Sequence, residues 1–136
     1  MKQELKVDRD YVGEGIYREN ILDHYKNVRN LGKIENADLE FHDLNPICGD
    51  EMTVSLNFDQ DKVREVKVLP KGCAISTASA SILSEELKGK NKKEIMKMKT
   101  EDIFKLLGIK LNSMRIKCAL LPLSTVKKAI CGVKNE

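Results

Sequence analysis

The sequence is poor in aromatic residues and in long apolar runs, and both shortages narrow its possible functions. Among 136 residues it has no tryptophan, three tyrosines and three phenylalanines, so few rings are available to stack on nucleic-acid bases. Its 24 basic residues nearly balance its 21 acidic ones, which leaves a formal charge of +3. We therefore expect no nucleic-acid partner. No apolar run approaches the roughly 18 residues of a membrane-spanning helix, so we expect no membrane partner either.

The sequence also shows neither a secretory signal nor the dense cysteines of a disulfide framework. Its first ten residues are charged throughout and lack the apolar segment of a signal peptide. We therefore expect a cytoplasmic protein, in which thiols stay reduced. The four cysteines stand far apart in the chain, at Cys48, Cys73, Cys118 and Cys131. Metal binding or catalysis is favoured over disulfide formation.

Length and patterning predict one domain that follows a short arm. A chain of 136 residues can bury a core without disulfides. Residues 1–15 have little apolar content, and we expect them to form a flexible N-terminal arm. Residues 16–136 then make up a single domain. Its first element is predicted to be an amphipathic helix from Ile16 to about Lys26, where apolar residues recur at helical spacing.

Alternation of apolar and polar residues predicts three strands. The clearest lies at residues 52–58, where Met, Val, Leu and Phe alternate with polar residues, so one face is expected to be buried. Residues 59–62 are typical of a turn, and residues 63–69 complete an antiparallel hairpin that Pro70 is expected to end. A weaker alternation within residues 33–45 predicts an edge strand.

Helical spacing returns in the second half of the chain. Residues 74–88 predict a helix that ends near a glycine. Two short helices are expected next, with Asn91 and Thr100 as their N-caps. A last helix is predicted to follow Cys118, with Pro122 in its first turn, where proline is tolerated.

Three of the cysteines lie in turns beside these elements. Cys48 stands two residues before Asp50 in a turn that contains glycine, and Gly72 precedes Cys73. The helices predicted after Cys73 and Cys118 would stabilise nearby thiolates at their N-termini. Three thiolates and one carboxylate would complete a four-coordinate metal site, so the candidate ligands are Cys48, Asp50, Cys73 and Cys118. From spacing alone, Asp50 is explained equally well as a turn or capping residue.

The remaining cysteine and the histidines are assigned structural roles. If Cys118 and Cys131 share one helix, thirteen steps of about 1.5 Å place them roughly 20 Å apart, too far to share one metal ion. Any single free cysteine is more often a small core residue than a ligand, and we accept that interpretation for Cys131. His24 and His42 are expected to pack or to lie on the surface. Three serines without a nearby base are interpreted as small packing residues: Ser76, Ser79 and Ser81.

Several motifs together resemble the iron–sulfur cluster scaffold proteins of the IscU, SufU and NifU N-terminal type. Residues 17–32 resemble that family's first helix with its Asp-His-Tyr and Asn-x-Arg-Asn-x-Gly signature, although Val28 stands where proline is usual. The motifs Cys48-Gly49-Asp50 and Gly72-Cys73-x-x-Ser76, and the third cysteine, Cys118, match in order and approximate spacing. The resemblance covers about residues 16–130, nearly the whole chain.

The resemblance implies an α+β fold, a small three-stranded antiparallel sheet with helices packed on one face and the cysteines at one end. It implies a scaffold more than an enzyme. Such a protein receives sulfur from a cysteine desulfurase, assembles a labile 2Fe–2S cluster and passes it to apo iron–sulfur proteins, and a homodimer is compatible with this role. By resemblance the cluster or zinc ligands are Cys48, Asp50, Cys73 and Cys118. Cys118 matches the persulfide acceptor of the IscU branch, and Cys48 matches that of the SufU branch.

The subtype remains open between two branches of the family. Lys117 stands where the IscU branch has histidine, and the run from Arg115 to Cys118 resembles SufU. The segment between Cys73 and Cys118, however, lacks the insertion typical of SufU. An alternative function is therefore a zinc-bound, SufU-like sulfur acceptor or transferase that works with a cysteine desulfurase, since the same ligands accept Zn²⁺. A purely structural zinc domain is the third possibility.

Overall fold

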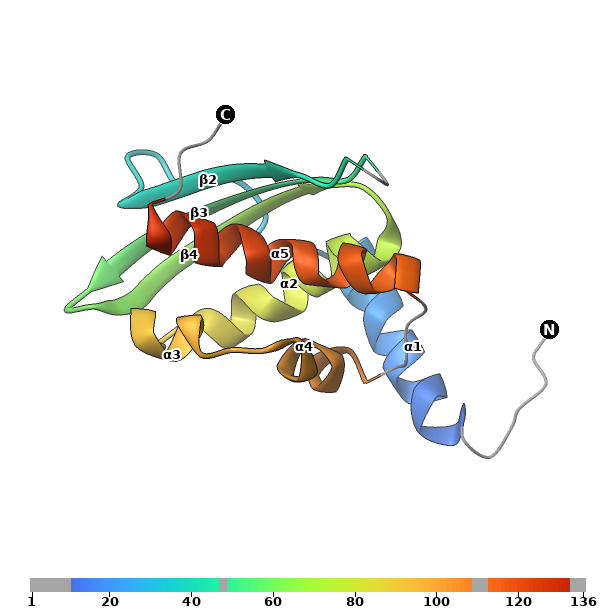
Figure 1. The fold of residues 1–136 in the computed structure, drawn as a ribbon. Coiled ribbons are helices and arrows are strands. Elements are labelled where there is room, and N and C mark those ends of the chain that lie inside the picture. Colours follow the sequence, from blue (N-terminus) through green and yellow to red (C-terminus); the bar gives the residue numbers. More distant parts are fainter. Residues whose placement is uncertain (1–10, 47–48, 109–112, 133–136) are drawn as a thin grey trace.

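Three antiparallel strands form the sheet on which the helices of this protein pack. The structure, a computed structural model, describes residues 11–46, 49–108 and 113–132. In chain order the elements are α1 (Tyr11–Lys26), β2 (Leu39–Leu44), β3 (Glu51–Asp59), β4 (Lys62–Lys71), α2 (Ala74–Leu87), α3 (Lys92–Met96), α4 (Thr100–Leu107) and α5 (Ser113–Cys131) (Figure 1).

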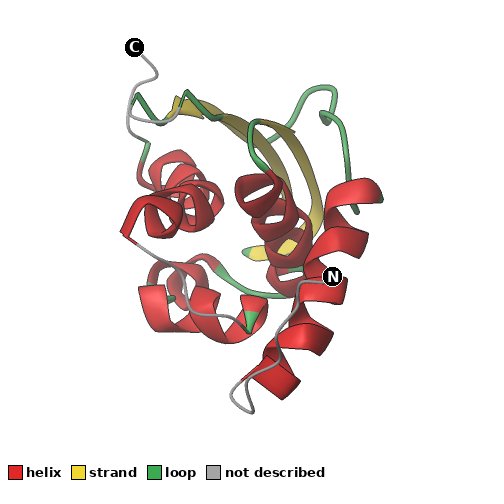
Figure 2. Cartoon of the chain, turned by 90° about the vertical axis from the view of Figure 1, so that its right-hand side faces the viewer, coloured by secondary structure: helices red, strands yellow, loops and turns green. Residues whose placement is uncertain are grey.

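The sheet has the strand order β2-β3-β4, and both pairings are antiparallel. The apolar residues of β3 that alternate along the strand are fully buried: Met52, Val54 and Leu56. Helix α2 packs against β4, and α5 packs against β2 and β3. Both helices lie on the same side of the curved sheet (Figure 2). The predicted α+β fold, a three-stranded antiparallel sheet with packed helices, is confirmed.

Two polar residues of β3 are buried as well, and both contact side chains of the neighbouring strand β2. Thr53 and Ser55 are both buried. The Nδ1 atom of His42 lies 2.9 Å from the hydroxyl oxygen of Thr53, and Ser55 donates a hydrogen bond of 3.1 Å to Glu40. The contacts follow from the register, which pairs His42 with Thr53 and Glu40 with Ser55. His42 thus belongs to the sheet.

Several element boundaries differ from those predicted. Helix α1 begins at Tyr11, five residues before the predicted start at Ile16, even though this stretch contains two glycines. Glycine lowers helix stability by only about 1 kcal/mol relative to alanine, so two of them do not prevent a helix. The rest of the predicted arm, residues 1–10, lies outside the described residues. Strand β4 continues through Pro70, which pairs with Met52; an edge strand tolerates proline because one of its sides has no strand partner.

The last helix also begins earlier than predicted. Helix α5 starts at Ser113, so Cys118 and Pro122 both lie in its interior. Proline inside a helix removes the hydrogen bond to the carbonyl four residues earlier and destabilises the helix by about 3 kcal/mol. Burial of Leu121, Leu123 and Val126 along the same helix offsets that loss.

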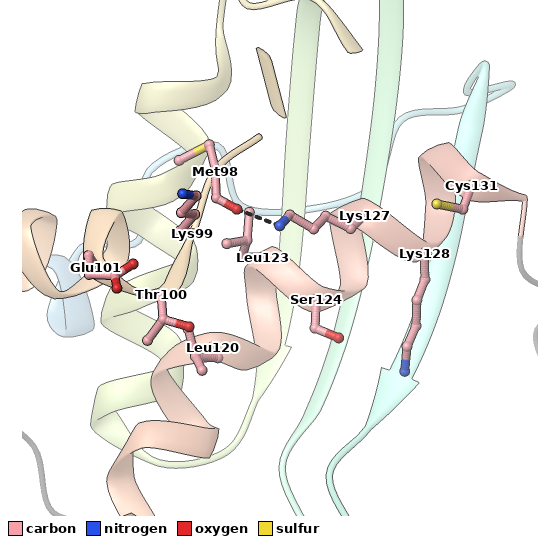
Figure 3. Close-up of a pocket in the computed structure, with 10 residues that line it drawn as sticks. All are labelled: Met98, Lys99, Thr100, Glu101, Leu120, Leu123, Ser124, Lys127, Lys128 and Cys131. Atoms are coloured by element: carbon pink, nitrogen blue, oxygen red, sulfur yellow. Dashed lines mark hydrogen bonds between the residues drawn. The ribbon is translucent and has the colours of Figure 1, made fainter. Parts of the chain in front are cut away.

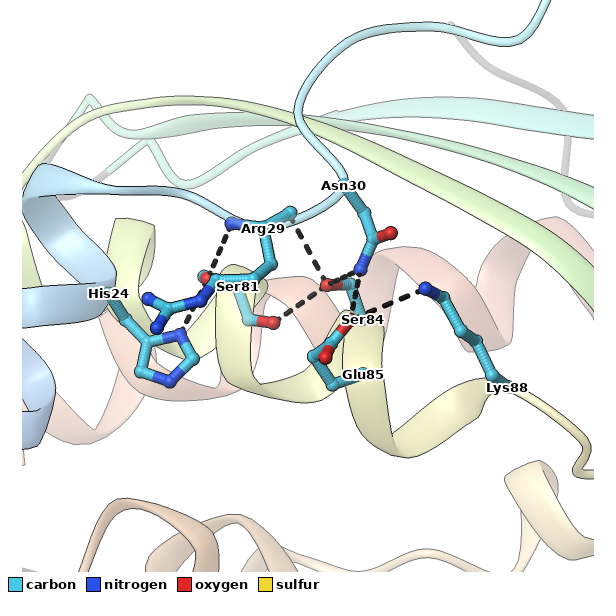
Figure 4. A network of polar contacts seen from close by, with 7 residues as sticks. All are labelled: His24, Arg29, Asn30, Ser81, Ser84, Glu85 and Lys88. Atoms are coloured by element: carbon cyan, nitrogen blue, oxygen red, sulfur yellow. Dashed lines mark hydrogen bonds and ion pairs between the residues drawn. The ribbon is translucent and has the colours of Figure 1, made fainter.

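A network of hydrogen bonds connects α1 and the segment after it to α2 (Figure 4). The backbone N–H of Arg29 donates to the Ser81 hydroxyl oxygen over 2.9 Å, and Nδ1 of His24 lies 2.7 Å from the same oxygen. Asn30 donates to both Ser84 and Glu85 over 2.8 Å. The interpretation that no base lies near the serines is therefore wrong for Ser81. Because Ser81 is fully buried, its contact with His24 joins the two helices.

The segment after α1 also closes part of the outer edge of β4. The N–H of Gly32 donates to the Val68 carbonyl over 2.9 Å, and the Val68 N–H donates to the Asn30 carbonyl over 2.8 Å. Asn30 and Gly32 both have positive φ angles, 57° and 130°, which asparagine and glycine adopt more readily than other residues. The Asn-x-Arg-Asn-x-Gly signature therefore describes a structural connection between α1, β4 and α2.

In the part of the chain that the structure describes, no helix is long and apolar enough to cross a membrane.

The contact between His24 and Ser81 predicts a dependence of stability on pH. Burial lowers the pKa of His24 below its ordinary value of 6.5, and the charge of Arg29 lowers it further. Between the folded-state pKa and 6.5 the unfolded chain therefore binds more protons, so the free energy of unfolding falls as the pH falls through this range. We expect His24→Gln to flatten this slope in urea denaturation measured from about pH 8 to about pH 5. An unchanged slope in the variant would contradict this role of His24.

Candidate metal centre

Three of the four predicted ligands meet at one end of the sheet. The ligand atoms of Asp50, Cys73 and Cys118 all lie within 4.8 Å of one another, and we call these residues the Asp50–Cys73–Cys118 cluster. Asp50 directly precedes β3, Cys73 directly precedes α2, and Cys118 lies in α5. The turn from β4 to α2 passes beside the first half of α5 (Figure 1). The fold thus gathers residues that are distant in the sequence.

Asp50 is held by the ends of two strands. Glu51 pairs with Lys71, so Asp50 and Gly72 are the next residues along the β3–β4 ladder. The Asp50 carbonyl accepts a hydrogen bond of 2.8 Å from the Asn45 N–H, which closes the turn between β2 and β3. The side-chain oxygen Oδ1 accepts a hydrogen bond of 3.2 Å from the Cys73 N–H. With 4% of its surface exposed, the Asp50 carboxylate is aimed inward at the cluster.

Cys73 is the N-cap of α2, as the sequence predicted for a helix beginning beside it. Its Sγ atom accepts a hydrogen bond of 3.5 Å from the Ser76 N–H, and the Ser76 hydroxyl donates to the Cys73 carbonyl over 3.2 Å. The Cys73 sulfur therefore lies at the N-terminal end of α2, where the helix carries its partial positive charge. The sequence predicted only a packing role for Ser76. Its spacing of three residues from Cys73 is the signal that identifies a cap contact.

Cys118 is placed differently from the prediction. Because α5 begins at Ser113, the thiol lies in the helix interior and gains nothing from a helix N-terminus, so that part of the prediction is wrong. Its side chain is only 5% exposed. Next to it, the Ser79 hydroxyl donates a hydrogen bond of 2.7 Å to the Ala119 carbonyl, which joins α2 to α5. This bond fixes Cys118 relative to the helix that Cys73 begins.

The other predicted residues do not join the cluster in the described part of the chain. Cys48 lies outside the described residues, so its role stays a prediction. His24 and His42 contact Ser81 and Thr53 instead. Cys131 is absent from the cluster, but it is exposed at the end of α5, so its interpretation as a small core residue is wrong.

Cys131 lines a separate groove between α5 and the segment from Met98 to Glu101 (Figure 3). The groove encloses about 520 Å³, and the amino group of Lys127 crosses it to donate to the Met98 carbonyl. A second hollow of about 450 Å³ lies between the end of β2 and α5, and Lys117 lines it beside the cluster. In that hollow Lys128 forms an ion pair of 2.8 Å with Asp43.

The chemistry and spacing of the Asp50–Cys73–Cys118 cluster fit a bound metal ion or a bound iron–sulfur cluster. Two sulfur ligands held about 2.3 Å from a tetrahedral Zn²⁺ lie about 3.8 Å from each other. The cluster atoms, within 4.8 Å of one another, need only a small closure to reach that arrangement. Two thiols and one carboxylate supply three ligands, and a fourth is required to complete the coordination. The predicted fourth ligand is Cys48, two residues before Asp50 in the sequence.

Comparison with known proteins then decides the family. The profile described as NifU-like N terminal domain matches residues 16–135. The chain belongs to the NifU-like N-terminal domain family. The resemblance predicted from the motifs is thereby confirmed.

The chain is similar both to proteins named as cluster assembly scaffolds and to a protein named as a sulfurtransferase. An iron–sulfur cluster assembly scaffold protein IscU from Aquifex aeolicus is 37% identical over 116 residues, which span 84% of this chain and 73% of that protein. A zinc-dependent sulfurtransferase SufU from Bacillus subtilis is 33% identical over 132 residues, with 85% of this chain and 89% of that protein covered. Sequence similarity alone therefore leaves both branches open.

A solved structure of the family has the same fold. It is the crystal structure of a putative iron–sulfur cluster assembly scaffold protein for the SUF system from Fervidobacterium islandicum. The two chains are 36% identical with a TM-score of 0.74, and the match covers 86% of this chain and 98% of that one.

The position of Cys131 predicts that it takes no part in metal binding. It lies thirteen residues from Cys118 on one continuous helix, a distance of about 20 Å. We expect Cys131→Ser to bind Zn²⁺ with the stoichiometry and affinity of the wild type, as measured by competition with a chromophoric chelator. The matched variant Cys118→Ser should lose affinity. Weakened binding by Cys131→Ser would refute the assignment.

Proposed function

We propose that the protein is a cytoplasmic scaffold on which a labile 2Fe–2S cluster is assembled and from which it is passed to apo-proteins. The observation that carries the proposal is the convergence of the ligand atoms of Asp50, Cys73 and Cys118 within 4.8 Å of one another, from the starts of β3 and α2 and the interior of α5. Cys48 is the fourth proposed ligand. Membership of the family, whose named relatives include IscU scaffolds, supports the same function.

The mixed donor set suits transfer of a cluster. Iron–sulfur clusters are held most firmly by four thiolates, and a hard carboxylate oxygen is a poorer partner for such a centre. Asp50 therefore makes the site weaker than a four-cysteine site. Cys73 is half-buried and its neighbour Gly72 is exposed, so one side of the cluster is open to a recipient protein.

Sulfur would arrive as a persulfide carried by a cysteine desulfurase. The acceptor thiolate attacks the terminal sulfur of that persulfide, the sulfur–sulfur bond breaks, and the desulfurase cysteine leaves as a thiolate. The step transfers one sulfur atom and needs no outside oxidant or reductant. Cys118 and Cys48 are the proposed acceptors. The burial of Cys118 counts against it as the first acceptor, because the attacking sulfur must reach the donor.

A second function, zinc-dependent sulfur transfer, is favoured by the spacing of the cluster. Three donor atoms within 4.8 Å of one another suit a single ion, and the donor types are those of zinc sites. In this case Zn²⁺ would occupy the proposed ligand set and the protein would accept and pass on sulfur without building a cluster. The similarity to the zinc-dependent SufU of Bacillus subtilis supports this alternative.

Anaerobic reconstitution tests the scaffold function. With iron, cysteine and a cysteine desulfurase, we expect the wild type to develop the visible absorption of a 2Fe–2S cluster and to transfer it to an apo-ferredoxin. The triple variant Cys48→Ser, Cys73→Ser, Cys118→Ser should develop neither signal, because serine replaces each thiolate with a poor ligand for iron. Equal reconstitution of the two proteins would end the proposal.

Metal and sulfide analysis after oxygen-free purification separates the two functions. A scaffold should contain iron with acid-labile sulfide in similar amounts. A zinc-dependent transferase should contain zinc without sulfide, and its stimulation of desulfurase turnover should disappear when the zinc is removed. A protein that contained zinc and stimulated no desulfurase would be a structural zinc domain.

A further inference from the structure

Gly72 lies closer to Asp50 than any other residue type could. A Cβ atom placed on Gly72 would lie 2.4 Å from both Cγ and Oδ1 of Asp50 and 2.8 Å from its Cβ. Contacts of a Cβ below 3.0 Å essentially do not occur in proteins. Directly opposed side chains on antiparallel strands normally have Cβ atoms about 4.5–5.5 Å apart. The Asp50 side chain therefore lies across the bare backbone of Gly72.

The backbone conformation does not account for a glycine at this position. Gly72 is absent from the described glycines with positive φ, which are Gly32, Gly49, Gly89, Gly108 and Gly132. An L-residue could adopt the conformation at position 72 without strain. Space for the neighbouring carboxylate is the remaining physical reason for the glycine.

The Asp50 side chain cannot easily move aside for a side chain at position 72. The atoms that a Cβ would meet include its own Cβ and Cγ, which move only if the backbone or the whole side chain moves. The Asp50 carbonyl is bonded to the Asn45 N–H, and Oδ1 is bonded to the Cys73 N–H. The next residue, Glu51, is already paired with Lys71 in the sheet. A side chain at position 72 would therefore push the carboxylate away from the two sulfur atoms.

We propose that Gly72 is a positioning residue of the metal centre, whose missing side chain lets the Asp50 carboxylate reach the sulfur atoms of Cys73 and Cys118. Gly72 has no ligand atom in its side chain and acts only through Asp50. The part of this inference that concerns metal rests on the proposed function, and the steric part does not. Residues that orient a metal ligand typically change metal affinity about 10- to 100-fold when they are replaced.

The steric part is tested on the metal-free protein by thermal unfolding. We expect Gly72→Ala to lower Tm in the wild-type background. It should lower Tm equally in Asp50→Asn, which keeps the size of the side chain, and clearly less in Asp50→Ala, which removes Cγ and both oxygens and leaves only the Cβ contact of 2.8 Å. Equal losses in all three backgrounds, or no loss in any of them, would overturn the proposal. Because the double variant Asp50→Ala, Gly72→Ala keeps only the contact between the two Cβ atoms, it is the form of the substituted chain expected to lose the least stability.

The metal part is tested by Zn²⁺ affinity in the same variants, measured by chelator competition. We expect Gly72→Ala to weaken binding about 10- to 100-fold, as far as Asp50→Ala does. The double variant should bind no more weakly than Asp50→Ala alone, since both changes remove the same ligand. Wild-type affinity in Gly72→Ala, or a further loss in the double variant, would contradict the proposal.

The two measurements also separate this inference from the proposed function. If the wild type bound neither zinc nor an iron–sulfur cluster, the proposed function would fail. The comparison of unfolding temperatures would still decide whether Gly72 makes room for Asp50.

Discussion

The candidate metal centre depends on the register between β3 and β4. The pairing of Glu51 with Lys71 places the next two residues, Asp50 and Gly72, against each other and turns the carboxylate toward the start of α2. A slip of one residue would send Asp50 to the opposite face of the sheet. The register is held by pairs of buried residues farther along the hairpin, such as Val54 with Val68. The apolar pairs of the hairpin therefore set the position of a polar ligand at its end.

Helix α2 is the second fixed part of this arrangement, and its small polar residues determine how it sits. Ser81 and Ser84 bind Arg29 and Asn30 in the segment after α1, and Ser79 binds the backbone of α5 beside Cys118. At the beginning of the helix, the Ser76 N–H bonds to the sulfur of Cys73. Buried hydroxyls whose hydrogen bonds are made hold packed elements in one relative position. Cys73 and Cys118 are thus carried by α2 and α5, two helices that a hydrogen bond joins directly.

Much of the fold could be predicted from local patterns, and the site could be predicted only in part. The alternation at residues 52–58 and the Asn91 cap depend on neighbouring residues, so the strand and the capping box agree with expectation. The predicted start of helix α5 is too late, because Pro122 is typical of a first helical turn. In the structure Pro122 lies inside the helix, where packing compensates for it.

Apart from the cap contact between Ser76 and Cys73, the missed contacts at the site and in the network are long-range. His24 is 57 residues from Ser81, and Asp50 is 23 residues from Cys73. No periodicity in the sequence encodes contacts of this kind. The meeting of the cysteines with Asp50 was predicted from their ligand chemistry and from the family resemblance, while the closeness of Gly72 to Asp50 needed coordinates. The segment from Asn30 to Gly32 also protects the edge of the sheet. It bonds to both the N–H and the carbonyl of Val68, so a strand of another molecule cannot pair with β4 at these groups. This arrangement disfavours edge-to-edge aggregation.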